Sequence, residues 1–315
     1  MPAIHHHPFR FGVLNFGVSS GAELTARAHQ HEELGYSTFL LSDHVFNFAP
    51  FTGMAAAALA TSHLRVGTYV LANDFWHPAM LAREALAIEL VSNGRLELGL
   101  GSGFYSGDYT QTGIPLDSPG VRISRLEESV SILKGLLSGE TVTFHDNYYN
   151  IDQLSVVPKS VQQPHPPILI GGGSRRILSL AARQADIVSF NIRTTPEGGF
   201  DPTSVTLQAT QEKVEWVCQA AGERLPGLEF NVLCQSATVT RDREQAARQI
   251  VEDWKFAAEY TVEQVLESPA FLIGEVGQIV EKLHQNRERF GFSYYVIFEN
   301  DLVSFAPVVQ RLAGR

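Results

Sequence analysis

The residues of this sequence that could carry chemistry follow short apolar segments, which predict buried strands. Asp43 and His44 follow the apolar segment 37–42. An imidazole next to a carboxylate can exchange protons near neutral pH. A single His at the end of a strand more often has a structural role. The pair alone therefore leaves the catalytic and the structural interpretation open.

A run of three glycines is the clearest physical signal. Gly171, Gly172 and Gly173 follow the apolar segment 168–170, and Ser174 begins a predicted helix with two arginines in its first turn. Glycines let the backbone approach a ligand closely, and the N–H groups at the start of a helix attract anions. This predicts a phosphate-binding loop. The alternative is a tight turn that needs glycine for its own geometry.

The segment 99–103, Gly-Leu-Gly-Ser-Gly, superficially resembles a dinucleotide-binding fingerprint. That fingerprint requires a glycine at one of the next positions, where Phe104 and Ser106 stand, and it follows a first strand. We therefore interpret the segment as the end of a fourth strand, whose small residues let a flat ring lie against the backbone.

Eight strand patterns, separated by helical patterns, position these residues. The apolar runs lack clean alternation, which is typical of strands buried on both faces of a parallel sheet. This predicts an α/β fold, a (β/α)₈ TIM barrel, with function at the carboxyl ends of the strands. The predicted strands are residues 9–15, 37–42, 64–71, 95–100, 168–170, 186–190, 228–238 and 294–298.

We expect a single barrel domain over residues 1–315 with two insertions. Residues 141–157 predict a β-hairpin that turns near Asp146 and Asn147. Residues 192–202, with their Thr, Pro and Gly, predict a loop beside the site.

The composition excludes several classes of function. The formal net charge of −10 disfavours nucleic acid and anionic membranes as partners. No apolar run approaches the length of a membrane span, so we expect a cytoplasmic protein. Cys218 and Cys234 predict neither a disulfide framework nor a zinc site. We expect no metal site, because His5, His6 and His7 are typical of a solvated tail.

Several stretches, taken in order, resemble the luciferase-like flavin monooxygenases and their coenzyme F420-dependent relatives. Each stretch is weakly specific, but their order and spacing together are characteristic, and they cover nearly the whole chain. They are residues 35–44 (GYSTFLLSDH), 65–68 (RVGT), 77–78 (HP), 93–103 (NGRLELGLGSG), 108–109 (DY), 113–115 (GIP), 125–128 (RLEE) and 166–174 (PPILIGGGS).

The resemblance implies a bacterial luciferase-like barrel that binds coenzyme F420, or alternatively FMN. It implies that His44 either binds the cofactor or acts as the acid/base. We therefore take His44 as the candidate proton donor. It also implies a cis peptide bond between Tyr69 and Val70, in a bulge behind the ring. The implied cofactor-binding residues are Asp43, His44, Tyr69, Val70, Ser102, Gly103, Phe104, Gly171, Gly172, Gly173 and Ser174.

One position departs from the family pattern. The sugar-phosphate dehydrogenases of the family carry a Glu directly after the Gly-x-Gly of strand four, where this chain has Phe104. The resemblance therefore favours reduction of an activated C=C, C=N or C=O bond of a small apolar substrate over oxidation of glucose 6-phosphate. The alternatives are an FMN-dependent monooxygenase and a flavin-binding protein without turnover. We expect a homodimer.

Overall fold

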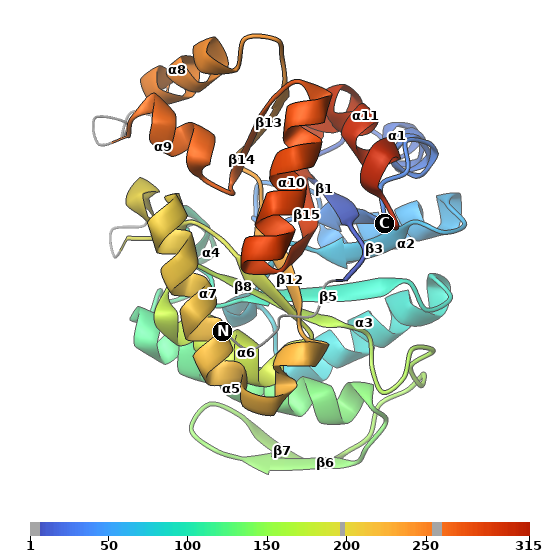
Figure 1. Cartoon of the computed structure of the whole chain (residues 1–315). Coiled ribbons are helices and arrows are strands. Elements are labelled where there is room, and N and C mark those ends of the chain that lie inside the picture. Colours follow the sequence, from blue (N-terminus) through green and yellow to red (C-terminus); the bar gives the residue numbers. More distant parts are fainter. Residues whose placement is uncertain (1–6, 196–198, 254–259) are drawn as a thin grey trace. The chain divides into compact units, whose positions relative to one another are not determined.

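The computed structural model describes residues 7–195, 199–253 and 260–315. By its internal contacts the chain divides into two compact units, whose elements are labelled in Figure 1. Unit 1 is made of residues 1–14, 33–37 and 171–315, and unit 2 is made of residues 15–32 and 38–170.

The strands of the main sheet in unit 2 are parallel, and most of their residues are buried. β3 (Arg65–Thr68) pairs with β2 (Thr38–Leu41) on one side and with β5 (Leu96–Gly101) on the other. β5 also pairs with β4 (Leu71–Ala72) and with the first three residues of β8 (Ile168–Gly172). Strands buried on both faces need apolar side chains throughout, which explains why these segments do not alternate.

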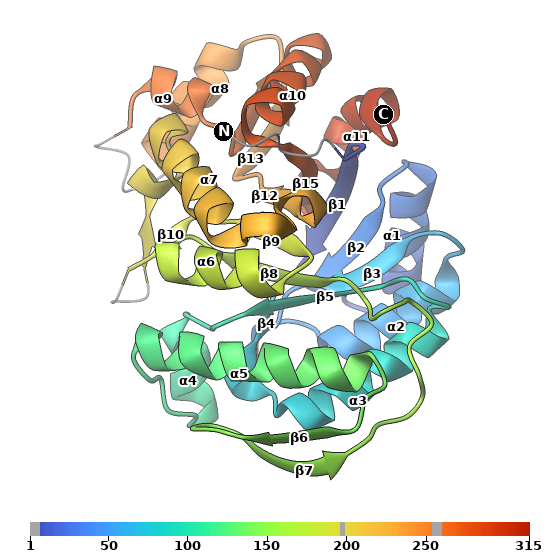
Figure 2. The ribbon, with the colours of Figure 1, turned by 60° about the horizontal axis from the view of Figure 1, so that its bottom comes forward.

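Helices and one hairpin complete unit 2. α3 begins with Pro78 at its first position, and His77 caps it by accepting a 3.3 Å hydrogen bond from the Ala79 N–H. α5 packs against α3 and contacts β6, and Figure 2 shows the hairpin of β6 and β7 below both helices. The hairpin turns at residues 146–149. The remaining bounds are α1 (Gly21–Glu33), α2 (Pro50–Ala60), α3 (Pro78–Val91), α4 (Ser106–Thr112), α5 (Pro119–Leu137), β6 (Val142–His145) and β7 (Asn150–Leu154).

Unit 1 contributes four further parallel strands. β15 (Phe292–Phe298) lies between β1 (Arg10–Asn15) and β12 (Glu229–Leu233), and β12 pairs with β9 (Ile187–Phe190). Its principal helices and turns are α6 (Arg175–Gln184), η2 (Pro202–Val205), α7 (Leu207–Ala221), η3 (Gly222–Gly227), α10 (Val276–Phe290), η5 (Glu299–Asp301) and α11 (Leu302–Leu312).

The segment 228–238 was predicted as one strand, and this prediction is wrong. After β12 the chain forms β13 (Ser236–Val239), which pairs with β14 (Phe271–Gly274) in a separate two-stranded sheet. Two helices, α8 (Arg243–Asp253) and α9 (Val262–Glu267), accompany this sheet.

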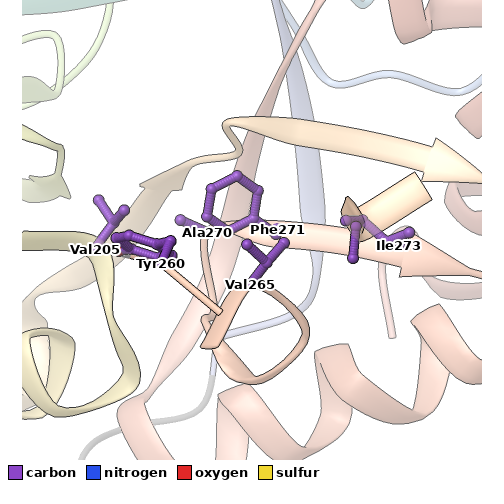
Figure 3. Packing of buried hydrophobic residues seen from close by; sticks show 7 residues of the cluster. Val205, Tyr260, Val265, Ala270, Phe271 and Ile273 are labelled. Carbon is purple, nitrogen blue, oxygen red and sulfur yellow. The ribbon is translucent and has the colours of Figure 1, made fainter. Parts of the chain in front are cut away.

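The small sheet has a hydrophobic core of its own, shown in Figure 3. Ala247 of α8 and Val265 of α9 are fully buried in it, at 0% and 1% exposed, and pack with Phe271 of β14. The other buried members are Val205, Tyr260, Ala270 and Ile273. After Leu233 the chain leaves the main sheet, and β13 pairs instead with β14, which contributes Phe271 and Ile273 to this core.

Eight parallel strands alternate with helices along the chain, which is the element order of a (β/α)₈ barrel. Strand three is interrupted after Thr68 and resumes as β4. In the predicted loop 192–202, β10 (Arg193–Thr194) and β11 (Phe200–Asp201) pair antiparallel, and residues 196–198 lie outside the described residues. Within the described residues no helix is both long and apolar enough to span a membrane. The single barrel domain over residues 1–315 stays a prediction.

Candidate active site

His44 and Asp108 form the closest polar contact at the end of β2. The His44 Nδ1 atom lies 2.6 Å from Asp108 Oδ2, and the Val45 N–H donates a 3.3 Å hydrogen bond to Asp108 Oδ1. The Asp108 side chain is 5% exposed and the His44 side chain 24%. One edge of an oriented imidazole therefore remains accessible to a ligand.

Asp43 links the ends of β2 and β4. Its Oδ2 atom accepts hydrogen bonds from the Ala72 N–H at 3.1 Å and from the Trp76 indole N–H at 2.8 Å. Burial raises the pKa of Asp43 to about 6, although these two donors and the nearby His44 oppose the rise. A carboxylate with a raised pKa beside an oriented imidazole is typical of a site that handles protons.

Three aromatic side chains surround His44. The Phe46 ring is stacked on the imidazole, with centroids 5.0 Å apart and an interplanar angle of 7°. Phe104 and Tyr105 present their edges to it at 6.0 and 5.7 Å. Phe46 is 62% exposed and Tyr105 is 40% exposed. The environment of the imidazole is thus apolar and open on one side.

The peptide bond between Tyr69 and Val70 is cis, which confirms the prediction. It lies in the interruption between β3 and β4, where the neighbouring strand provides space. A Cβ atom on Gly99 would lie 2.0 Å from the Thr68 carbonyl oxygen, and a Cβ on Gly101 would lie 2.6 Å from Val70 Cγ2. These two glycines therefore accommodate the bulge of strand three. That small residues at this strand end also let a ring lie against the backbone stays a prediction.

Ser102 and Gly103 continue from β5 and are fixed by Arg122. The Arg122 guanidinium donates to the carbonyl oxygens of both residues, at 3.3 Å for Ser102 and more closely for Gly103. Gly103 has a φ of +72°, and a Cβ there would lie 1.9 Å from the hydroxyl of Tyr109. The turn thus requires glycine at this position, and Ser102, Gly103 and Phe104 are partly exposed after a fully buried strand.

The glycine loop belongs to unit 1, and packing explains two of its glycines. A Cβ on Gly172 would lie 2.2 Å from Ile177 Cγ2, and one on Gly173 would lie 2.6 Å from the backbone of Arg193. Both contacts favour the alternative of a tight turn for these two residues. Ser174 is the N-cap of α6, and its side chain makes no capping hydrogen bond. Its hydroxyl and the helix N-terminus are the features that suit an anion.

The seven predicted site residues of unit 2 follow three buried strands, β2, β3 and β5. Asp43, His44 and the residues at the ends of β3 and β5 all follow buried strands and are partly exposed, except for Tyr69, which is 5% exposed. Gly171, Gly172, Gly173 and Ser174 lie together in unit 1. The described residues hold no group of three or more His, Cys, Asp or Glu side chains that could bind a metal ion, and His5 and His6 lie outside them.

Sequence reasoning missed Asp108 as the partner of His44 and Trp76 as the partner of Asp43. Asp108 occupies the first turn of α4, where an acidic residue is ordinary in any helix. No local signal distinguishes either residue, because the partners are 64 and 33 positions away in sequence.

Comparisons with known proteins point to one family. Residues 7–294 match the family model described as luciferase-like monooxygenase. An F420-dependent glucose-6-phosphate dehydrogenase of Nakamurella multipartita is 30% identical over 264 residues, which are 80% of this chain and 73% of that protein.

Two further relatives show the range of the similarity. The FMNH(2)-dependent dimethylsulfone monooxygenase of Pseudomonas putida is 32% identical over 131 residues, so that the match covers 42% of this chain and 36% of that protein. The structure of the coenzyme F420-dependent tetrahydromethanopterin reductase of Methanopyrus kandleri superposes with a TM-score of 0.77 at 16% identity, over 97% of this chain and 99% of that one. This likeness confirms the predicted fold class.

Proposed function

This chain belongs to the luciferase-like monooxygenase family, and we propose that within it the chain is a coenzyme F420-dependent oxidoreductase. The chemistry that this cofactor supplies when bound is hydride transfer between its C5 atom and a small organic substrate. The favoured reaction is reduction of an activated C=C, C=N or C=O bond.

We choose F420 over FMN because of the length of one sequence alignment. The F420-dependent relative aligns over 80% of this chain, whereas the FMNH(2)-dependent relative aligns over 42%. The types of residue at the site suit either cofactor, since both cofactors need a surface for a ring system and a place for a phosphate.

We assign the ring to the strand ends of unit 2. Asp43 is suited to bind a polar edge of the ring, because its Oδ1 atom makes no hydrogen bond to the described part of the chain, whereas Oδ2 is held by Trp76 and Ala72. Tyr69 and Val70 would back the ring, and the partly exposed residues 102–104 would line it. His44 is the proposed proton donor, and Phe46 and Phe104 lie against its imidazole.

We assign the phosphate to the residues 171–174. The basis is the N-terminus of the ten-residue helix α6 together with the uncommitted hydroxyl of Ser174. Gly172 and Gly173 let the loop pack closely against Ile177 and Arg193 and so shape it.

The aromatic side chain of Phe104 favours one class of substrate over another. It stands where the family's sugar-phosphate dehydrogenases have a proton-handling Glu, and it is in edge contact with His44. With Phe46 and Tyr105 it gives the site an aromatic lining. We therefore expect an apolar substrate and no oxidation of glucose 6-phosphate by that route.

A second candidate function is an FMN-dependent monooxygenase. The specific observation in its favour is the similarity to the FMNH(2)-dependent dimethylsulfone monooxygenase, of which this chain covers about a third. The third candidate is a flavin-binding protein without turnover, in which the contact between His44 and Asp108 would only hold the loop after β2.

The remaining expectations concern partners and location. The acidic net charge still argues against nucleic acid as a partner and is consistent with a cytoplasmic enzyme. For the homodimer we propose the surface of α2 and α3, which pack against each other and expose Leu59 at 75% and Leu90 at 58%.

The experiment that tests the proposed function is a binding titration of the protein with oxidised F420, FMN and FAD, followed by fluorescence. Tight binding of F420 supports the proposal. Preferential binding of FMN supports the monooxygenase instead.

A further inference from the structure

The Asp108 carboxylate does not serve its own helix. It lies in the first turn of α4, where an acidic side chain ordinarily interacts with the N–H groups of that turn. Here its two oxygens contact His44 Nδ1 and the Val45 N–H, 64 and 63 positions earlier in the chain. The side chain is almost fully buried, at 5% exposed. One carboxylate therefore holds both the ring and the backbone after β2.

This contact decides which nitrogen of His44 carries a fixed proton. An ionised carboxylate can only accept hydrogen bonds, so where the Asp108 carboxylate is ionised the 2.6 Å contact places a proton on Nδ1. In the described part of the chain the Nε2 atom has no hydrogen-bond partner. The Phe46 ring is stacked on the imidazole, and Phe104 and Tyr105 meet it at steep angles.

We propose that Asp108 is the positioning residue that keeps His44 protonated on Nδ1, so that Nε2 is the atom that exchanges a proton with the substrate. This inference rests on the proposed function for the identity of the reaction. The arrangement of the two residues stands independently of it. The same logic operates wherever a buried carboxylate orients a catalytic imidazole.

A reduction at this site balances in electrons and protons. The substrate takes two electrons and one hydrogen as a hydride at one atom, and it takes a proton from Nε2 of doubly protonated His44 at the other atom. His44 is left neutral, with its remaining proton on Nδ1 in the hydrogen bond to Asp108. Because the His44 side chain is 24% exposed, Nε2 can then regain a proton from water. In the oxidation direction each transfer is reversed.

Because Asp108 also contacts the Val45 N–H, the Asp108→Asn variant tests which nitrogen of His44 is protonated. Asn has a single acceptor oxygen, at the position to which the Val45 N–H donates. The introduced amide would then turn its NH₂ group toward His44 Nδ1, which favours the form of the ring protonated on Nε2. The Asp108→Glu variant keeps a carboxylate and should keep the proton on Nδ1.

The measurement is ¹⁵N NMR of the protein labelled at histidine, without cofactor, across a pH series that includes the neutral form of the ring. The His44 signals are identified by their loss in His44→Ala. We expect Nδ1–H in the wild type and in Asp108→Glu, and a shift toward Nε2–H in Asp108→Asn. The exposed Asp152→Asn variant removes the same charge elsewhere and should leave the His44 signals unchanged.

Two results would overturn the inference. The first is a wild-type ring protonated on Nε2, and the second is an unchanged ring in folded Asp108→Asn, which would leave Asp108 only a role in holding the loop. A parallel titration with F420 separates the two claims. Failure to bind F420 would contradict the proposed function, whereas the state of the His44 ring is read without any cofactor.

Discussion

The indole N–H of Trp76 donates a 2.8 Å hydrogen bond to the carboxylate of Asp43, and so ties the start of α3 to the end of β2. The same oxygen accepts from the Ala72 N–H. The second oxygen of this carboxylate makes no hydrogen bond within the described residues, and we propose that it binds the cofactor. Asp43 therefore has a structural role and a proposed role in cofactor binding. The ionisation of its carboxyl group affects both roles.

The first prediction concerns the pH dependence of stability. Burial raises the pKa of Asp43 to about 6 in the folded protein, against about 3.9 for Asp in an unfolded chain. The folded state thus binds this proton more tightly. The contribution of Asp43 is fully present below about pH 4 and is lost as the pH rises through about 6.

Asp43→Asn cannot ionise but keeps an oxygen that accepts from Trp76 and Ala72. Its melting temperature relative to the wild type should rise between about pH 4 and pH 6, and level off above. Thermal unfolding followed by circular dichroism measures this, with Asp152→Asn as the control for charge. Parallel curves for Asp43→Asn and the wild type would show that Asp43 titrates normally.

The second prediction concerns the phosphate. Asp is a good N-cap, so Ser174→Asp should preserve α6 while it places a negative charge at the proposed site. We expect F420 affinity to fall at least about tenfold, or about 1.4 kcal/mol. Thr206→Asp makes the same change at the N-cap of α7 and should bind F420 as the wild type does.

Ser174→Asp is a cleaner variant than Gly172→Asp. Any Cβ at Gly172 would meet Ile177 at 2.2 Å, so lost affinity there could reflect a displaced helix. Unchanged F420 affinity in folded Ser174→Asp would mean that the loop serves the turn only.

The third prediction concerns His44. If it donates the proton, His44→Ala should lower turnover by about 10²–10⁴-fold, while F420 affinity stays within a small factor. Reduced F420 and a panel of α,β-unsaturated ketones, imines and aldehydes provide the assay. Because Asp108 acts through His44, Asp108→Asn should cost no further turnover in the His44→Ala background. A large loss of affinity with turnover preserved at saturation would reassign His44 to binding.

The fourth prediction concerns assembly. Leu59→Glu or Leu90→Glu puts a charge into the proposed interface of α2 and α3 and should convert a dimer into monomers. Analytical ultracentrifugation measures the change. Val303→Glu alters an apolar side chain of α11 that is 63% exposed and should leave the dimer intact. A wild type that stays monomeric at high concentration would refute the dimer itself.

Much of the fold was predictable because its signals are local. The helix 78–91 has Pro at its start and Asn93 and Gly94, both with positive φ, after its end, and its predicted bounds are those observed. The segment 228–238 failed because periodicity cannot tell which sheet a strand joins. Val232 and Ala237 are both buried, but in different sheets.

The candidate site was predictable in its strand ends but not in its partners. Asp43 and His44 stand out because they follow an apolar run directly. Asp108 does not, because its role arises only when α4 is packed beside the end of β2. The cis bond after Tyr69 was predictable only from the family, since nothing in the residues 68–71 favours it.

The most direct test of the central claim is a competition between F420 and FMN for the same protein. F420 should bind with a dissociation constant in the low micromolar range or below, and FMN at least about tenfold more weakly, a difference of about 1.4 kcal/mol. FMN that binds as tightly as F420, or displaces it at equal concentration, would contradict the account and favour the monooxygenase.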